Sequence, residues 1–204
     1  MRRPSHSFRA RTAAAVLAAS MFVPAAAAHG ETVTVHDAVG DVESSYLNDN
    51  EDIVPAPQYA ATDITRTVAS YGTARLKVTV HLRDLRNASA LQAYVWIRTP
   101  RARFAASLVR GGPRVVKTAF GRRRTGEVEC EGFSGTYEGR KDRVTLVVPA
   151  ACVDSPRWLQ VGVTATGFEV EDAETDEFAL QLDDANRDGD GEKNIRLGQR
   201  IRRG

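Results

Sequence analysis

The clearest evidence for the fold class is the stretch LKVTVHLR at residues 76–83. Leucine and valine occupy every second position, so in an extended strand they share one face while the polar residues share the other. This alternation predicts a strand buried on one side. Working outward, we find β-rich stretches bounded by glycine, proline or polar turns at 32–36, 64–71, 92–99, 103–109, 114–120, 133–137, 143–148, 158–166 and 178–182.

Short strands at this spacing are typical of antiparallel all-β domains. We therefore predict an all-β fold, a single-domain β-sandwich or jelly roll at residues 29–183, followed by an Asp/Gly-rich loop and a basic tail at 184–204. Residues 37–61 are rich in Asp, Asn, Glu and Pro, and we expect them to form a long surface excursion. Long irregular segments on a rigid scaffold are where binding sites usually lie.

The amino terminus has the pattern of a secretory signal peptide. Arginines are followed by an apolar run at 13–23 and by small residues that include Ala26 and Ala28. The run is too short and too rich in alanine to be a stable membrane span. We expect residues 1–28 to be removed and the secreted, extracellular protein to start at His29. The leader is bacterial in character.

Charge is distributed unevenly along the chain. Residues 85–126 hold ten Lys or Arg and no carboxylate, whereas residues 167–192 hold eleven acidic side chains and one arginine. Such asymmetry could steer a polyanion to one face. Alternatively, the arginines are solvated outward positions of strands and loops. The second interpretation is favoured because few aromatic residues are interleaved with them, and this also argues against a nucleic-acid partner.

The two cysteines, Cys130 and Cys152, are both in the mature chain. An even pair of cysteines in a secreted protein predicts a disulfide. It would close a loop of about 23 residues, which stabilises the fold by roughly 3 kcal/mol in the chain-entropy model. We therefore predict one structural disulfide.

Residues 184–192, DANRDGDGE, carry side-chain oxygens at every second position. Calcium accepts six to eight hard oxygen ligands, and a curled loop of this kind can supply them. We predict a calcium site here, and its candidate ligands are Asp184, Asn186, Asp188, Asp190 and Glu192. The alternative is a solvated linker.

Over its first six positions this segment resembles the calcium loop of EF-hands and dockerins. It departs from that loop at Ile195, which stands where the closing glutamate belongs, and the preceding residues have a strand period. The resemblance therefore implies calcium chemistry for about a dozen residues and no EF-hand fold.

A second acidic cluster begins at Asp37, continues through Gly40 and Asp41, and reaches Asp63-Ile64 at the start of a strand. This opening resembles that of family 9 carbohydrate-binding modules. The resemblance implies a jelly roll that binds sugars or haem-like ligands and sometimes holds a structural calcium. It makes Asp37, Asp41 and Asp63 secondary candidates for metal ligands.

The aromatic residues that clasp the ligand in that family cannot be placed in this sequence. Trp96 and Trp158 are the two tryptophans, and both stand within apolar strands. Tryptophan in that setting is typically part of the core. Carbohydrate binding is therefore an expectation drawn from the resemblance alone.

If cleavage follows Ala28, His29 becomes the terminal residue. Its α-amine and ring nitrogen could together hold Cu(II), which favours nitrogen ligands. For two residues this terminus resembles secreted copper proteins and lytic polysaccharide monooxygenases. A second histidine would be required, either His81 or His36. The alternative is a cleavage site that precedes a histidine in a frayed terminus.

The sequence contains no nucleophile elbow, His-Glu-x-x-His motif, phosphate loop or dinucleotide fingerprint, and an enzyme is not supported. We expect a secreted, non-enzymatic binding or envelope-associated module that binds calcium. Carbohydrate, including cell-envelope polymers, is the leading ligand class. The alternatives are a copper-binding protein or copper oxidase-type enzyme that uses His29, and a purely structural secreted protein.

Overall fold

A computed structural model of the chain describes residues 30–46, 53–86, 88, 90–112, 115–172, 177–187 and 195–204. Within these ranges the chain forms fourteen strands and two short 3-10 helices. None of the helices in this part of the chain is long and apolar enough to cross a membrane. The predicted all-β, single-domain fold is confirmed.

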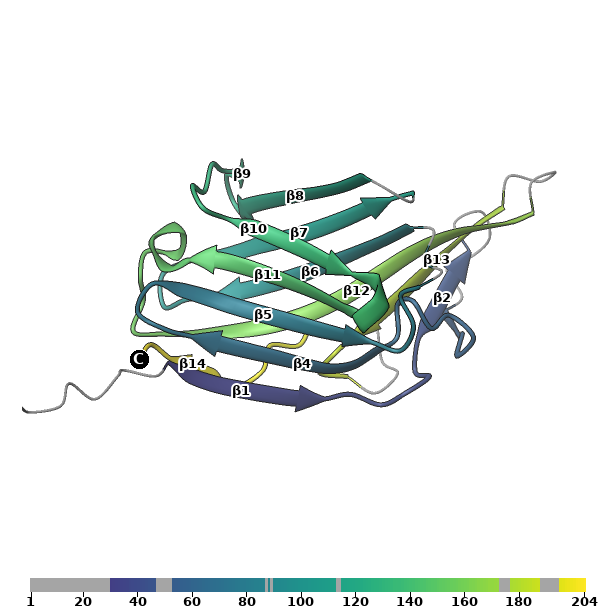
Figure 1. Ribbon diagram of the computed structural model, residues 1–204, viewed down its shortest axis with the longest axis horizontal. Helices are drawn as coiled ribbons and strands as arrows, with labels where there is room; N and C mark the ends of the chain where they lie inside the picture. The colour runs from purple at the N-terminus through teal and green to yellow at the C-terminus, as the bar shows by residue number, and fades with distance from the viewer. Residues whose placement is uncertain are drawn as a thin grey trace, which may run out of the picture.

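Five strands form the smaller sheet, in which every neighbouring pair is antiparallel. In spatial order they are β1 (Glu31–His36), β4 (Ile64–Tyr71), β5 (Arg75–Leu82), β11 (Arg143–Pro149) and β10 (Ser134–Glu138). The 3-10 helix η1 (Gly139–Lys141) makes the turn between β10 and β11. In Figure 1 this sheet lies in front of the larger one.

Nine strands form the larger sheet, which is also antiparallel. Its spatial order is β3 (Ile53–Pro55), β2 (Glu43–Tyr46), β13 (Glu177–Asp184), β12 (Trp158–Asp172), β6 (Ala90–Arg98), β7 (Arg103–Gly111), β8 (Val115–Arg122) and β9 (Gly126–Glu127). The last strand, β14 (Arg200–Arg202), pairs with β12 beside the end of β13.

The core lies between the two sheets. On β5 the apolar residues of the alternating stretch, Leu76, Val78 and Val80, are fully buried, as the sequence pattern predicts. They pack in one cluster with the inward residues of β6, of which Val95 is fully buried. Alternate residues of both sheets therefore fill one continuous interior.

The segment predicted as a surface excursion, residues 37–61, is partly structured. It contributes β2 and β3, and its residues Val42 and Ala56 are almost completely buried. The prediction was wrong there because β2 gains its hydrogen bonds from β13, more than a hundred residues away, and has no apolar alternation of its own. At the other end of the chain, Ile201 of β14 is buried in the core.

The predicted disulfide is confirmed. Cys130 follows β9, and Cys152 lies in η2 (Ala150–Val153), the 3-10 helix after β11. Their Cα atoms are 5.6 Å apart. The bond therefore ties the segment between the two sheets to the end of β11.

Candidate metal centre

Three carboxylates converge where the segment before β2, the residue before β4 and the end of β13 meet. Asp41, Asp63 and Asp183 each offer one oxygen, and these three oxygens lie within 4.8 Å of one another. Calcium binds its ligands at about 2.3–2.6 Å, so two oxygens on opposite sides of one ion are separated by at most about 5 Å. The spacing of this acidic triad therefore suits a single calcium ion.

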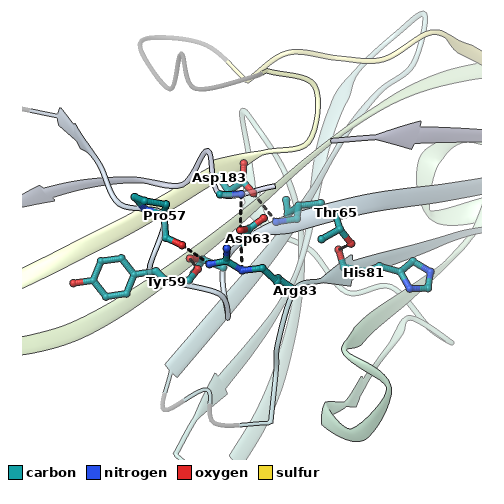
Figure 2. Close-up of polar contacts among 10 residues, drawn as sticks. Pro57, Tyr59, Asp63, Thr65, His81, Arg83 and Asp183 are labelled. Carbon is teal, nitrogen blue, oxygen red and sulfur yellow. Dashed lines mark hydrogen bonds and ion pairs between the residues drawn. The ribbon is translucent and has the colours of Figure 1, made fainter. Parts of the chain in front are cut away.

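Asp63 is fully buried and is held by two neighbours. Its Oδ2 atom accepts a hydrogen bond of 2.8 Å from the backbone N–H of Gly40 and lies 3.1 Å from Nε of Arg83. Gly40 has a φ of +82°, a backbone conformation that favours glycine. Figure 2 shows the Asp63 carboxylate between Asp183 and Arg83.

Arg83 contacts both Asp63 and the segment after β3. Its backbone N–H donates to the carbonyl of Asp63 at 2.8 Å, and its guanidinium group donates to the carbonyl of Pro57. The arginine therefore holds the Asp63 carboxylate and the segment after β3 in one position.

Asp183 lies on β13 and is 3 % exposed. Its Oδ2 atom accepts a hydrogen bond of 2.6 Å from the backbone N–H of Ile64, the first residue of β4. Burial, together with the negative charges of Asp41 and Asp63, raises the pKa of Asp183 to about 8. Burial also raises the pKa of Asp63, against the lowering effects of Gly40 and Arg83. Burial and the repulsion between neighbouring carboxylates thus disfavour the ionised form of these side chains.

The second carboxylate oxygen of Asp63 is the feature of the site that most favours a bound cation. Oδ1 of Asp63 is buried and has no hydrogen-bond partner among the described residues. A buried carboxylate oxygen without a partner costs free energy that a coordinated cation would offset. The chemistry of the triad, three hard anionic oxygens, suits calcium.

The structure brings together two of the three secondary candidates. Asp41 and Asp63 are in the triad, whereas Asp37 is not; its backbone N–H donates to the carbonyl of Thr65 at 3.2 Å. Asp183 was missed by sequence reasoning. The only signal for it was its place beside Asp184 at the end of an alternating strand.

The residues of the predicted calcium loop are described in part. Asp184 is buried, and its carboxylate accepts hydrogen bonds from the backbone N–H groups of Asn186, at 3.2 Å, and Arg196, at 3.0 Å. These bonds tie the start of the loop to the segment before β14. Three further candidate ligands lie outside the described residues, so the loop remains a prediction: Asp188, Asp190 and Glu192.

The copper alternative needs His29 together with a second histidine, such as His81. His29 lies outside the described residues, so this alternative remains a prediction. The ring of His81 makes a hydrogen bond of 3.1 Å with the guanidinium group of Arg66. Burial and the nearby Arg66 and Arg143 lower the pKa of His81. In Figure 2 its ring points away from Asp63.

A groove of about 1050 Å³ lies on the larger sheet, over β6, β7, β8 and β12. Trp96 lines it and is half-buried, with its ring Nε1–H donating to the hydroxyl of Thr164 at 3.2 Å. Trp158 is also half-buried, and the guanidinium carbon of Arg200 lies 4.2 Å from the centre of its ring. The expectation that both tryptophans belong to the core was wrong, because each occupies an outward position of its strand.

Comparisons with family models, with curated proteins and with solved structures find no match for this chain. The geometry of the acidic triad and of the groove therefore carries the functional argument.

Proposed function

We propose that this protein is a secreted, non-enzymatic binding module that holds a structural calcium ion at Asp41, Asp63 and Asp183. The observation that carries the proposal is the convergence of these three carboxylates, with Oδ1 of the fully buried Asp63 lacking a hydrogen-bond partner among the described residues. Calcium tolerates irregular sets of oxygen ligands and keeps water in the remaining positions, so three protein carboxylates can anchor it.

The role of the ion is structural because its ligands come from separate parts of the sandwich. Asp63 precedes β4 of the smaller sheet, whereas Asp183 belongs to β13 of the larger sheet. An ion bound by both residues joins the two sheets, and its binding site exists only in the folded state. Such an ion adds to the free energy of unfolding.

Carbohydrate is the ligand class we propose for the module. The groove is lined by a half-buried aromatic ring, Trp96, and by polar side chains that include Gln160. Concave sites with an aromatic side chain and a few polar groups are typical of small-ligand binding. The resemblance of the Asp37–Asp41 turn and Asp63 to family 9 carbohydrate-binding modules supports the same class.

The calcium proposal is tested by thermal melts of the chain from His29, first in chelator and then with calcium up to millimolar concentrations. We expect a melting temperature that rises by several degrees, since a ligand at 100 times its Kd stabilises the fold by about 2.7 kcal/mol. Asp41→Asn keeps the size of the side chain and should abolish the rise. Titration calorimetry should give one ion per chain.

Asp188→Ala is the matched control, since it removes a carboxylate from the predicted loop at 184–192 and leaves the triad intact. We expect this variant to keep the calcium-dependent rise. If Asp188→Ala abolishes the rise and Asp41→Asn keeps it, the loop holds the ion and the triad does not. If wild-type protein shows no rise, calcium binding is excluded.

A further inference from the structure

Two parallel rows of side chains cross the groove on the outer face of the larger sheet. The first row runs over four neighbouring strands and consists of Gly162 on β12, Trp96 on β6, Ala105 on β7 and Gly121 on β8, which are paired in register. Trp96 is the single large side chain in this row. The backbone of Arg196 lies over Gly162 and that of Gly126 lies over Gly121, so the hollow is above Ala105 and Trp96, with one aromatic ring on its floor.

The second row lies next to the first and is polar and cationic. Gln160 pairs with Arg98, Arg98 pairs with Arg103, and the backbone N–H of Arg123 donates to the carbonyl of Arg103 at 3.0 Å. Arg122 also lines the groove, with its guanidinium carbon 5.7 Å from the centre of the Phe104 ring. Because Arg122 pairs with the inward Phe104, its guanidinium group lies on the other side of the sheet, and three arginines border the hollow around Trp96: Arg98, Arg103 and Arg123.

The charges of these arginines are not neutralised by the part of the protein that the structure describes. No acidic residue is among those that line the groove, and none of the described ion pairs includes Arg98, Arg103, Arg122 or Arg123. Arg98 and Arg103 are exposed and stand directly opposite each other on β6 and β7, and like charges in that position destabilise a sheet. An anionic group bound between them would offset this repulsion.

We propose that the groove binds an acidic polysaccharide, with a sugar ring on Trp96 and a carboxylate or sulfate group against Arg98 and Arg103. Planar guanidinium groups bind such oxyanions through paired hydrogen bonds. This inference rests on the proposed carbohydrate-binding function and adds the charge class of the ligand to it.

The floor and one wall of the groove are fixed before a ligand arrives. The Trp96 ring is held by its hydrogen bond to Thr164 and by stacking on Tyr94, with ring centres 5.6 Å apart. Ile195 and Leu197, from the segment before β14, line the groove above Gly162. A site held in this way loses little conformational entropy when it binds.

The same features favour a saccharide over a nucleic acid. Proteins that bind single-stranded nucleic acid without sequence preference stack successive bases on several aromatic side chains. Trp96 is the one half-exposed aromatic ring that lines this groove in the described part of the chain, since Phe104 is 4 % exposed and faces the core. A single ring beside a row of cations matches one sugar unit and its acidic substituent.

The test compares dextran sulfate and carboxymethyl-dextran with neutral dextran, by titration calorimetry on the calcium-loaded chain at about 0.15 M salt. We expect both acidic polymers to bind at least about tenfold more tightly than dextran. Arg98→Gln combined with Arg103→Gln should remove most of that difference. The control double variant, Arg75→Gln with Arg140→Gln, removes two exposed positive charges elsewhere and should bind as wild type does.

A second measurement uses fluorescence. Trp158→Phe leaves Trp96 as the single tryptophan, so a ligand in the groove should change the emission of this variant. An unchanged emission, or an equal loss of affinity in the control double variant, would show that the arginine groove is not the site.

The remaining outcomes separate the two proposals. Equal binding of dextran and the acidic polymers overturns the charge class and leaves the proposed carbohydrate function standing. Binding of none of the three polymers overturns both. Tighter binding of a single-stranded oligonucleotide than of either acidic polymer would identify nucleic acid as the polyanion and overturn the saccharide.

Discussion

The carboxylate of Asp183 accepts a hydrogen bond of 2.6 Å from the backbone N–H of Ile64. This bond joins β13 of the larger sheet to the first residue of β4 in the smaller sheet, over 119 positions of sequence. The same carboxylate belongs to the acidic triad. Asp183 therefore connects the cohesion of the two sheets with the proposed binding of calcium.

We expect the stability of the chelated protein to fall between about pH 4 and pH 8. The pKa of Asp183 rises from 3.8 in its ordinary state to about 8 in the metal-free fold. A carboxyl group with a raised pKa in the folded state favours folding while it is protonated, and this contribution is lost as the pH rises through the folded pKa. One unit of pKa difference corresponds to 1.36 kcal/mol, so the loss should be at least about 1.4 kcal/mol.

Urea denaturation in chelator at pH 5 and pH 8 measures this loss. Asp183→Asn keeps an oxygen for the N–H of Ile64 and cannot ionise, so its stability should change less with pH than that of wild type. At pH 8 in calcium, wild type should be more stable than Asp183→Asn, because wild type gains the ion and the variant does not. Equal pH dependence of the two chelated proteins would contradict the assignment of the raised pKa to Asp183.

The disulfide should support the fold without affecting the calcium site. Cys152 lies in η2, after the end of β11 that pairs with Arg75, whereas Asp63 precedes the end of β4 that pairs with Leu82. These are opposite ends of the smaller sheet. Replacing both cysteines with serine should lower the free energy of unfolding by about 3 kcal/mol. The calcium-dependent rise in melting temperature should persist. Its loss would show that the calcium site depends on the disulfide and would contradict this prediction.

Tyr71 is fully buried, and its hydroxyl donates to the carbonyl of Pro156 at 2.9 Å. Tyr71→Phe removes the donor and leaves the partly buried carbonyl oxygen of Pro156 with one partner fewer. We expect a loss of about 1 to 3 kcal/mol in urea denaturation. Tyr94→Phe is the control, since Tyr94 is half-exposed and the same hydroxyl group is removed there from a side chain that solvent reaches. A Tyr71→Phe variant as stable as wild type would show that the hydrogen bond contributes nothing net.

The strands of the core could be predicted from the sequence because apolar and polar residues alternate along them, and this local pattern predicts which face is buried. Leu76, Val78 and Val80 of β5 are the clearest example. Strand β2 could not be predicted in this way, since it is short and polar and depends on hydrogen bonds from β13. Its Ser44 is buried although serine gives no hydrophobic signal for an inward position.

The acidic triad shows the same limit at the level of the site. On β13 the alternating Leu180 and Leu182 are half-buried, whereas Gln181 and Asp183 are buried. The polar face of this strand turns inward because it meets the Asp63 region of the other sheet, a relationship that no local pattern contains. Asp41 and Asp63 could be proposed from their turn, but their partner Asp183 required the fold.

Gly162 gives the most direct test of how the groove is built. A Cβ atom at this position would lie 2.7 Å from the backbone carbonyl oxygen of Arg196 and 3.0 Å from Cγ2 of Ile195. Backbone at that distance cannot give way as the end of a flexible side chain can, so the segment before β14 must move. We expect Gly162→Ala to lower the free energy of unfolding by about 1 to 3 kcal/mol, the usual cost of overpacking.

The same substitution should also weaken the binding of dextran sulfate, because Ile195 and Leu197 form the groove wall that moves. Gly72→Ala is the control: the nearest atom to its added Cβ is the carbonyl oxygen of Arg75, at 4.0 Å, and no strain follows. If Gly162→Ala is as stable as wild type and binds dextran sulfate equally well, the wall is not fixed against β12. If it is destabilised but binds as before, the wall is fixed and takes no part in holding the polysaccharide.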